Sequence, residues 1–140
     1  MVEITINTEK FKLISVFSSI MGITAVDCII DDKTGKLIYL IPEKDFILFE
    51  LSLKNKVKLL ENLLKRRIEV ISFSKDPVKF VKNILRPIRV KEVYIAQRDN
   101  GKKVLRIQLI KSRYNNPAKI KKVKRLVGRY FKDVDEIIIR

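Results

Sequence analysis

The sequence predicts an α+β fold that consists of two copies of one small unit. Apolar residues recur at helical spacing in some segments and form continuous β-rich runs in others. Both halves of the chain show the same order of helix, strand, strand, helix and strand, offset by roughly 65 residues. The length of 140 residues suits one ordinary domain or two very small ones, so a pair of short units is the economical interpretation.

The first half begins with a helix that we predict over residues 9–21. Its apolar residues recur on one face, Asn7 or Thr8 can cap its start, and Gly22 suits its end. Two apolar runs then flank a turn that contains Gly35, which predicts a hairpin. The elements predicted after the first helix are strands at 23–31 and 37–41, a helix at 53–65 and a strand at 68–73.

The second half begins at Asp76 and Pro77. Aspartate is a favoured N-cap, and proline suits the first helical position. Asn100 and Gly101 predict a tight hairpin turn. The elements predicted in this half are a helix at 77–85, strands at 89–97 and 104–110, a helix at 118–131 and a strand at 134–140. We therefore expect two domains, residues 1–75 and 76–140.

The composition argues against catalysis. The chain has no histidine and a single cysteine, which removes the commonest general base and the usual soft metal sites. Neither a Gly-rich phosphate loop nor a nucleophile motif is present. Cys28 lies in an apolar run, so we expect a buried small residue rather than a nucleophile. The sequence thus predicts no enzyme activity, no metal, no cofactor and no small-molecule substrate.

The chain also lacks the patterns of membrane and secreted proteins. No apolar run approaches the roughly 18 residues that cross a bilayer. The first residues lack the basic-then-apolar order of a secretory signal, and one cysteine leaves no intramolecular disulfide framework. We expect a cytoplasmic protein that makes no contact with a membrane.

Positive charge is concentrated in the second half. The formal net charge is +15, yet residues 1–76 contain 12 Lys and Arg against 11 Asp and Glu. Residues 77–140 contain 19 basic residues against 5 acidic ones. Charge that served solubility alone would be spread over both halves. The asymmetry therefore favours a polyanionic partner for the second half, most simply nucleic acid.

Three stretches resemble the archaeal NusA-like transcription factors: FSSIMGITAVDCIIDD, LLENLLKRRIEVISFSKDP and FVKNILRPIRVKEVYI. The order of helix, hairpin, helical segment and final strand in each half is that of a type II KH domain, and the resemblance covers nearly the whole chain. It implies two tandem type II KH-like domains, each a three-stranded sheet with helices packed on one face. It also implies a role in transcription elongation or termination.

KH domains of this family would hold single-stranded RNA beside a Gly-x-x-Gly loop, where small residues let the sugar-phosphate backbone approach main-chain N–H groups. The resemblance places that loop at residues 51–54 of the first copy, and neither glycine is present. The second copy has no such motif in the shorter stretch at 111–119. The apolar stretch FILFELSLK, residues 46–54, either packs as an extra turn of core helix or exposes an apolar contact for a protein partner.

The predicted helix at 118–131 is the strongest functional feature. Its apolar residues share one face, and its cations carry no acidic residue between them, whereas a solvated face normally mixes both signs. We predict that nucleic acid is bound by Lys111, Arg113, Lys119, Lys121, Lys122, Lys124, Arg125 and Arg129. A phosphate at the start of this helix would lie near Lys119 and Lys121. Just before it, Tyr114 is either a base-stacking ring or a buried one, and Asn115 and Asn116 either donate to the ligand or form a turn.

The leading hypothesis is a non-catalytic RNA-binding transcription factor that contacts single-stranded RNA through this basic helix. RNA polymerase or other transcription proteins are the further partners that the resemblance implies. One alternative is a protein–protein adaptor of the transcription machinery that has lost RNA binding. Another is nonspecific binding of duplex DNA, because the same cations suit either polymer.

Overall fold

The computed structural model describes residues 2–110 and 117–140, and the side chains of these residues from Thr8 onward. The chain divides into two compact units, Met1–Phe73 (unit 1) and Ser74–Arg140 (unit 2). This division falls two residues before the predicted domain boundary. In the part of the chain that the structure describes, no helix has both the length and the hydropathy that crossing a membrane requires.

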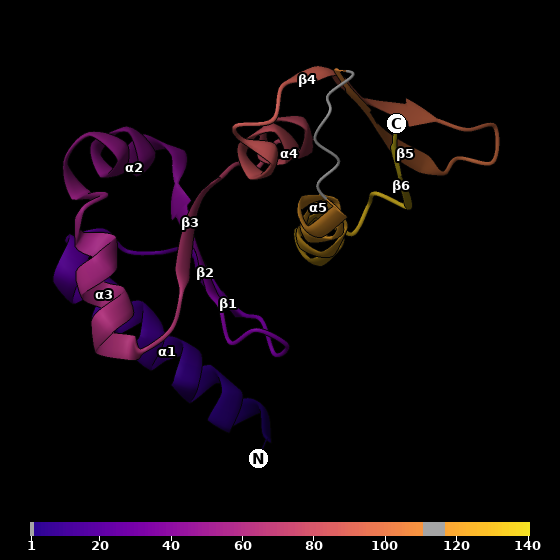
Figure 1. Ribbon diagram of the computed structural model, residues 1–140. Helices are drawn as coiled ribbons and strands as arrows, with labels where there is room; N and C mark the ends of the chain where they lie inside the picture. Colours follow the sequence, from indigo (N-terminus) through magenta and orange to yellow (C-terminus); the bar gives the residue numbers. More distant parts are fainter. Residues whose placement is uncertain (1, 111–116) are drawn as a thin grey trace. The chain divides into compact units, whose positions relative to one another are not determined.

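Unit 1 is a three-stranded sheet with its helices on one face (Figure 1). Its elements are α1 (Val2–Met21), β1 (Asp27–Ile30), β2 (Leu37–Pro42), α2 (Glu43–Leu48), a π-helical turn (Phe49–Leu53), α3 (Lys56–Leu64) and β3 (Ile68–Phe73). Strand β2 is central: β1 pairs with it in the antiparallel direction and β3 in the parallel direction.

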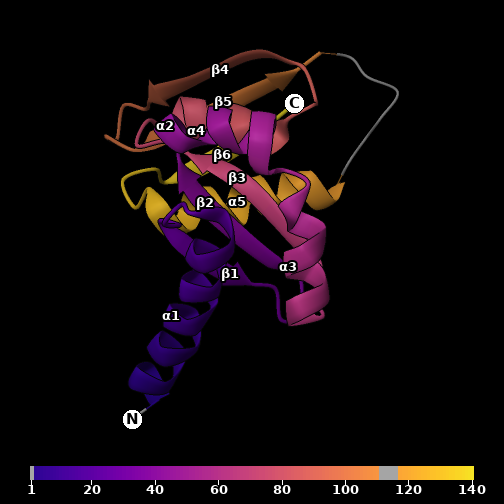
Figure 2. The ribbon, with the colours of Figure 1, turned by 90° about the vertical axis from the view of Figure 1, so that its left-hand side faces the viewer.

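Helix α1 is longer than predicted. It begins at Val2 rather than near residue 9, so Asn7 and Thr8 lie inside the helix and do not cap it. No glycine or proline precedes Gly22, and nothing in the sequence interrupts the helix toward its start. The helix ends as predicted, because Gly22 has a φ of +71° and its N–H donates to the Ser18 carbonyl at 2.8 Å. Figure 2 shows the first turns of α1 extending beyond the strands.

The core of unit 1 forms between α1, the sheet and α3. The rings of Phe17 and Tyr39 stack with their centroids 4.4 Å apart, and both side chains are fully buried. The Tyr39 hydroxyl donates a hydrogen bond to the Leu13 carbonyl at 2.9 Å. Cys28 is also fully buried, which confirms the prediction for this residue. Its burial raises the pKa of the thiol to about 11, so the thiol stays protonated at neutral pH.

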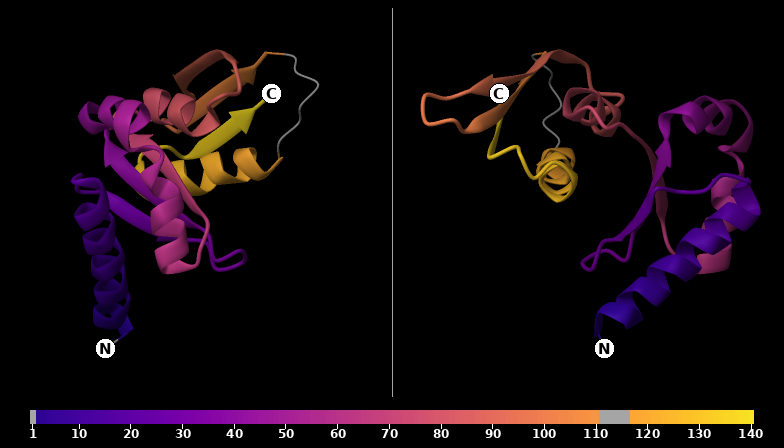
Figure 3. Two further views of the ribbon diagram at one scale, coloured as in Figure 1. Left: turned by 60° about the vertical axis from the view of Figure 1, so that its left-hand side comes forward. Right: turned by 180° about the vertical axis from the view of Figure 1, so that it is seen from behind.

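Unit 2 repeats this architecture (Figures 1 and 3). Its elements are α4 (Pro77–Leu85), β4 (Val90–Gln97), β5 (Lys103–Leu109), α5 (Pro117–Tyr130) and β6 (Glu136–Ile139). Strand β5 is central, with β4 antiparallel and β6 parallel to it. Helices α4 and α5 cover one face of this sheet (Figure 3). The predicted fold class, α+β with two KH-like units of three strands each, is confirmed.

Two local predictions in unit 2 are also confirmed. The Asp76 carboxylate accepts a hydrogen bond from the Val78 N–H at 3.0 Å and caps α4, with Pro77 at the first helical position. The hairpin between β4 and β5 turns at Gly101, whose φ of +84° is a conformation that glycine adopts without strain.

Candidate nucleic-acid interface

Helix α5 presents cations to solvent on the side opposite its core contacts. Val123, Leu126 and Val127 are buried. At 3.6 residues per turn, the residues between these positions point outward. The outward side carries four exposed cations, which we call the basic face: Lys121, Lys124, Arg125 and Arg129.

The orientation of the basic face is fixed by the packing of α5 on α4. Phe80 of α4 is fully buried and meets two rings at the end of α5. The ring of Tyr130 lies edge-on to it at 6.1 Å between centroids, and the ring of Phe131 is tilted at 5.8 Å. Such aromatic pairs prefer a defined geometry, so they hold the rotation of α5 about its axis.

Lys119, at the start of α5, contacts the end of the neighbouring helix. It is half-buried, and its ammonium donates to the carbonyl of Arg86, the residue that follows α4. Lys119 lies four and seven residues before Val123 and Leu126, so it shares the packed side of the helix. In this structure the ammonium of Lys119 is engaged by the Arg86 carbonyl, and a phosphate contact of Lys119 with Lys121 stays a prediction. Lys122 is half-buried at the margin of the basic face.

Part of the predicted site lies outside the described residues. This applies to Lys111, Arg113, Tyr114, Asn115 and Asn116. Their contacts with a ligand stay predictions.

Acidic residues after α5 contact the β4–β5 hairpin. The Asp133 carboxylate lies 3.5 Å from the Lys103 ammonium, and Asp135 accepts a hydrogen bond from the Lys103 backbone N–H at 2.8 Å. Glu136 pairs with Arg98 at 3.0 Å. These carboxylates offset the positive charge of the hairpin.

Arg129 lies over the ring of Tyr130, with 5.8 Å between the guanidinium carbon and the ring centroid.

In unit 1 the stretch where the family's RNA loop would lie is helical. Helix α2 begins directly after Pro42, with Glu43 and Asp45 in its first turn, and a π-helical turn follows it. The helix predicted at 53–65 is present as α3, Lys56–Leu64, whereas α2 and the π-helical turn before it were not predicted. The acidic residues of the first turn and the absence of glycine favour helix from residue 43. No Gly-x-x-Gly loop exists here to clamp RNA.

Both interpretations of residues 46–54 describe part of the observed packing. Phe49 is buried, and Phe46 and Leu53 pack against the core. Three other residues form what we call the apolar surface: Ile47, Leu48 and Leu51, which are 69%, 52% and 80% exposed. An open hollow of about 470 Å³ lies beside this turn and is lined by Glu50, Leu51, Ser52, Lys54 and Asn55. With one anion and one cation, this hollow offers little attraction to phosphate.

Comparison with known proteins agrees with the sequence resemblance. No protein-family model matches the chain. The probable transcription termination protein NusA of Methanococcus vannielii is 29% identical over 97 residues, 69% of this chain. The protein of the same name from Methanocaldococcus jannaschii is 25% identical over 97 residues. The resemblance to the archaeal NusA-like family is confirmed.

The similarity to these NusA proteins covers only part of their length. The chain spans about half the length of these curated relatives, 55% of the first and 52% of the second. A crystal structure of the protein APE1850 matches 95% of this chain and 99% of that chain, with a TM-score of 0.78 and 28% sequence identity.

Among the described residues, no cluster of three His, Cys, Asp or Glu side chains could hold a metal ion.

Proposed function

We propose that this chain is a non-catalytic, cytoplasmic RNA-binding factor of transcription termination or elongation, and that unit 2 binds single-stranded RNA through the basic face of α5. The names of the relatives support the transcription role. RNA polymerase or other transcription proteins are the further partners that this role implies. Unit 1 then acts as a scaffold or a protein contact, since its α2–α3 segment lacks the family's clamp.

The basic face is the observation that carries the proposal. Its four exposed cations project from a helix that α4 holds in place through Phe80. Flexible ammonium and guanidinium groups suit the phosphates of a single strand, and binding releases counterions. Phosphate contacts position a strand without reading its bases, so affinity from this face should depend weakly on sequence.

Filter binding of a short single-stranded RNA in a series of salt concentrations tests the proposal. About four to six phosphate contacts give a log–log slope of roughly −3 to −4. Between 50 and 200 mM salt the affinity should then fall by roughly 60- to 250-fold. A slope near zero, or no binding at low salt, would reject the proposal.

Competition separates RNA from duplex DNA. Unlabelled single-stranded RNA should displace the labelled strand at a lower nucleotide concentration than duplex DNA does. The reverse order would indicate a protein that binds duplex DNA through the same cations.

A second candidate function is that of a protein–protein adaptor, and the apolar surface of unit 1 favours it. Large apolar side chains that are exposed together commonly mark a protein contact. The adaptor hypothesis predicts an acidic partner from the transcription machinery. Affinity capture followed by nuclease treatment discriminates the two functions, because protein partners that survive nuclease favour the adaptor and partners released with RNA favour the RNA-binding factor.

A further inference from the structure

The sheet of unit 2 has a second face, opposite α4 and α5, that carries polar and aromatic side chains. Side chains alternate between the faces along each strand. The buried residues Val93 and Ile107 are opposite each other in the register and face the helices. Tyr94 and Arg106, the next pair along, therefore point to the other side, as does Ile138, the partner of Arg106 on β6. We call this side the outer face.

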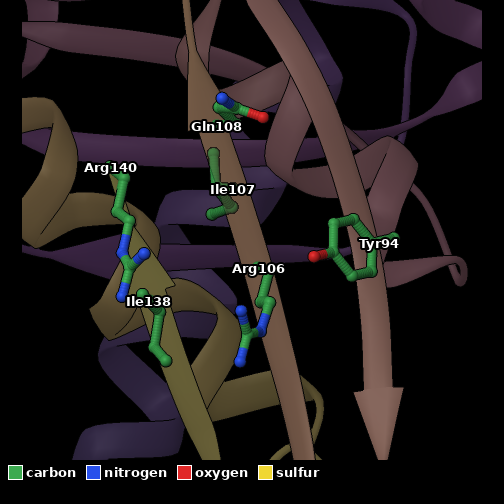
Figure 4. A pocket seen from close by; sticks show the side chains of 6 residues that line it. All are labelled: Tyr94, Arg106, Ile107, Gln108, Ile138 and Arg140. Carbon is green, nitrogen blue, oxygen red and sulfur yellow. The ribbon is translucent and has the colours of Figure 1, made fainter.

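A hollow of about 150 Å³ lies on the outer face. Its lining residues are Tyr94, Arg106, Ile107, Gln108, Ile138 and Arg140 (Figure 4). Its volume is well below the roughly 300–1,000 Å³ of pockets that enclose a small molecule. A single flat group resting on the sheet suits this space better than an enclosed metabolite does.

The chemistry of this hollow suits one nucleotide. Tyr94 is 41% exposed, and its ring offers a stacking surface. Figure 4 shows the guanidinium groups of Arg106 and Arg140 on the same face as this ring, and the amide of Gln108 farther along the same strand as Arg106. A guanidinium can donate two parallel hydrogen bonds to a phosphate, and an amide can both donate to and accept from a base edge.

Among the described residues, the Nε–H of Arg106 has no hydrogen-bond partner. The atom itself is buried. A buried donor without a partner lowers stability, and such groups in folded proteins are usually satisfied by protein, water or a ligand. Because the atom is not open to solvent, an acceptor bound in the hollow would satisfy it after a movement of the Arg106 side chain.

Unit 1 provides an internal comparison. The corresponding face of its sheet carries the apolar residues Ile29, Ile38, Leu40 and Ile71. Ile38 is flanked by strand partners Ile29 and Glu69, whereas Arg106 is flanked by Tyr94 and Ile138. The aromatic and basic outer face is thus a property of unit 2, the unit with the concentrated positive charge.

We propose that the outer face of unit 2 binds one nucleotide of a single-stranded RNA, with the base stacked on Tyr94 and the adjoining phosphate held by Arg106 and Arg140. This inference rests on the proposed RNA-binding function and adds a second contact to that of the basic face. Stacking accepts any base because every base has a π-face, so the site anchors a strand without selecting a sequence.

The test compares two RNA ligands on three variants. The ligands are a short fluorescein-labelled oligouridine and the same strand with its bases removed, and affinity is measured by fluorescence anisotropy. Wild type should bind the oligouridine roughly 5- to 100-fold more tightly than the abasic strand. Tyr94→Leu should abolish this preference, and Tyr94→Phe should keep it because phenylalanine retains the stacking ring.

The charge-reversal variant of the basic face separates this proposal from the function on which it rests. Lys121→Glu with Arg125→Glu should weaken both ligands equally and keep the ratio between them. If Tyr94→Leu keeps the wild-type preference for oligouridine over the abasic strand, the outer-face site is overturned and the proposed function is not. Failure of the wild-type chain to bind either strand would overturn both proposals. Circular dichroism checks that each variant remains folded.

Discussion

The ammonium group of Lys119 donates a hydrogen bond to the backbone carbonyl of Arg86. The contact joins the first turn of α5 to the residue that follows α4, within unit 2. A cation at this point satisfies a carbonyl that the end of a helix leaves without an intrahelical partner. The contact ties the start of α5 to the end of α4, and a phosphate contact of Lys119 stays a prediction.

Replacing Lys119 should separate a role in the packing of unit 2 from a role in RNA binding. Lys119→Met keeps the apolar stem and removes the donor, so unit 2 should lose about 1 kcal/mol of unfolding free energy. RNA affinity should stay within about threefold of wild type, since one phosphate contact at most is absent. Urea denaturation and filter binding measure the two effects. A large loss of affinity without a loss of stability would return Lys119 to the binding site.

Gly128 should be replaceable by alanine with a gain in stability. It lies within α5 on the exposed side, and a Cβ atom added there meets nothing within 4 Å. Alanine is favoured over glycine in a helix interior by roughly 0.8–1 kcal/mol. Gly128→Ala should therefore raise the urea midpoint of unit 2. A lowered midpoint would contradict the open surroundings of this position.

Cys28 should be unreactive in the folded chain. Its pKa of about 11, raised by burial from 9.0, leaves about 100-fold less thiolate at pH 8 than an unburied thiol has. A disulfide reagent should react slowly with the native chain at pH 8 and rapidly in urea. Equal rates in the two conditions would show that the thiol is accessible.

The same shift has a consequence for stability. Because the pKa of Cys28 is higher in the folded state, its contribution to stability is complete below pH 9 and is lost as the pH rises through 11. Burial also raises the pKa of Tyr39, which acts in the same direction at higher pH. Unfolding free energy should fall above pH 9, and Cys28→Ala should reduce this dependence. If the unfolding free energy of the variant depends on pH as that of the wild type does, groups other than Cys28 cause the dependence.

The apolar surface of unit 1 should tolerate polar residues. Leu51→Ser should change the unfolding free energy by less than about 0.5 kcal/mol, because the side chain is 80% exposed. Leu60→Ala is the matched control: this leucine is fully buried, and its truncation should cost about 2–5 kcal/mol. Loss of a captured protein partner with Leu51→Ser, without loss of stability, would favour the adaptor function. A stability loss equal to that of the control would place Leu51 in the core.

Local signals predicted much of the fold. The cap at Asp76 and the turn at Gly101 depend on residues a few positions apart, and both were found as expected. The start of α1 and the helical turn after Pro42 were missed. At the start of α1 the sequence offers capping residues, but the helix continues through them. After Pro42, the acidic residues in the first turn of α2 were the signal for helix.

The site was less predictable because it depends on which side of an element faces the core. Spacing separated Lys121 and Arg125 from the buried side of α5 but did not reveal the contact of Lys119 with a distant carbonyl. The outer face was missed as well. Tyr94 and Arg106 are neighbours only through strand pairing, and the signal that the sequence offered was the spacing of two polar residues in β5, Arg106 and Gln108, two positions apart.

The most direct test of the account compares two triple charge reversals that change the net charge equally. One replaces Lys121, Lys124 and Arg125 of the basic face by glutamate, and the other replaces the exposed Lys54, Lys56 and Lys58 of unit 1. The first should lower affinity for single-stranded RNA by roughly 100-fold or more at low salt and flatten the salt slope by about 2. The second should lower affinity by less than about tenfold, through long-range charge alone. Equal effects of the two variants would contradict the assignment of RNA binding to α5.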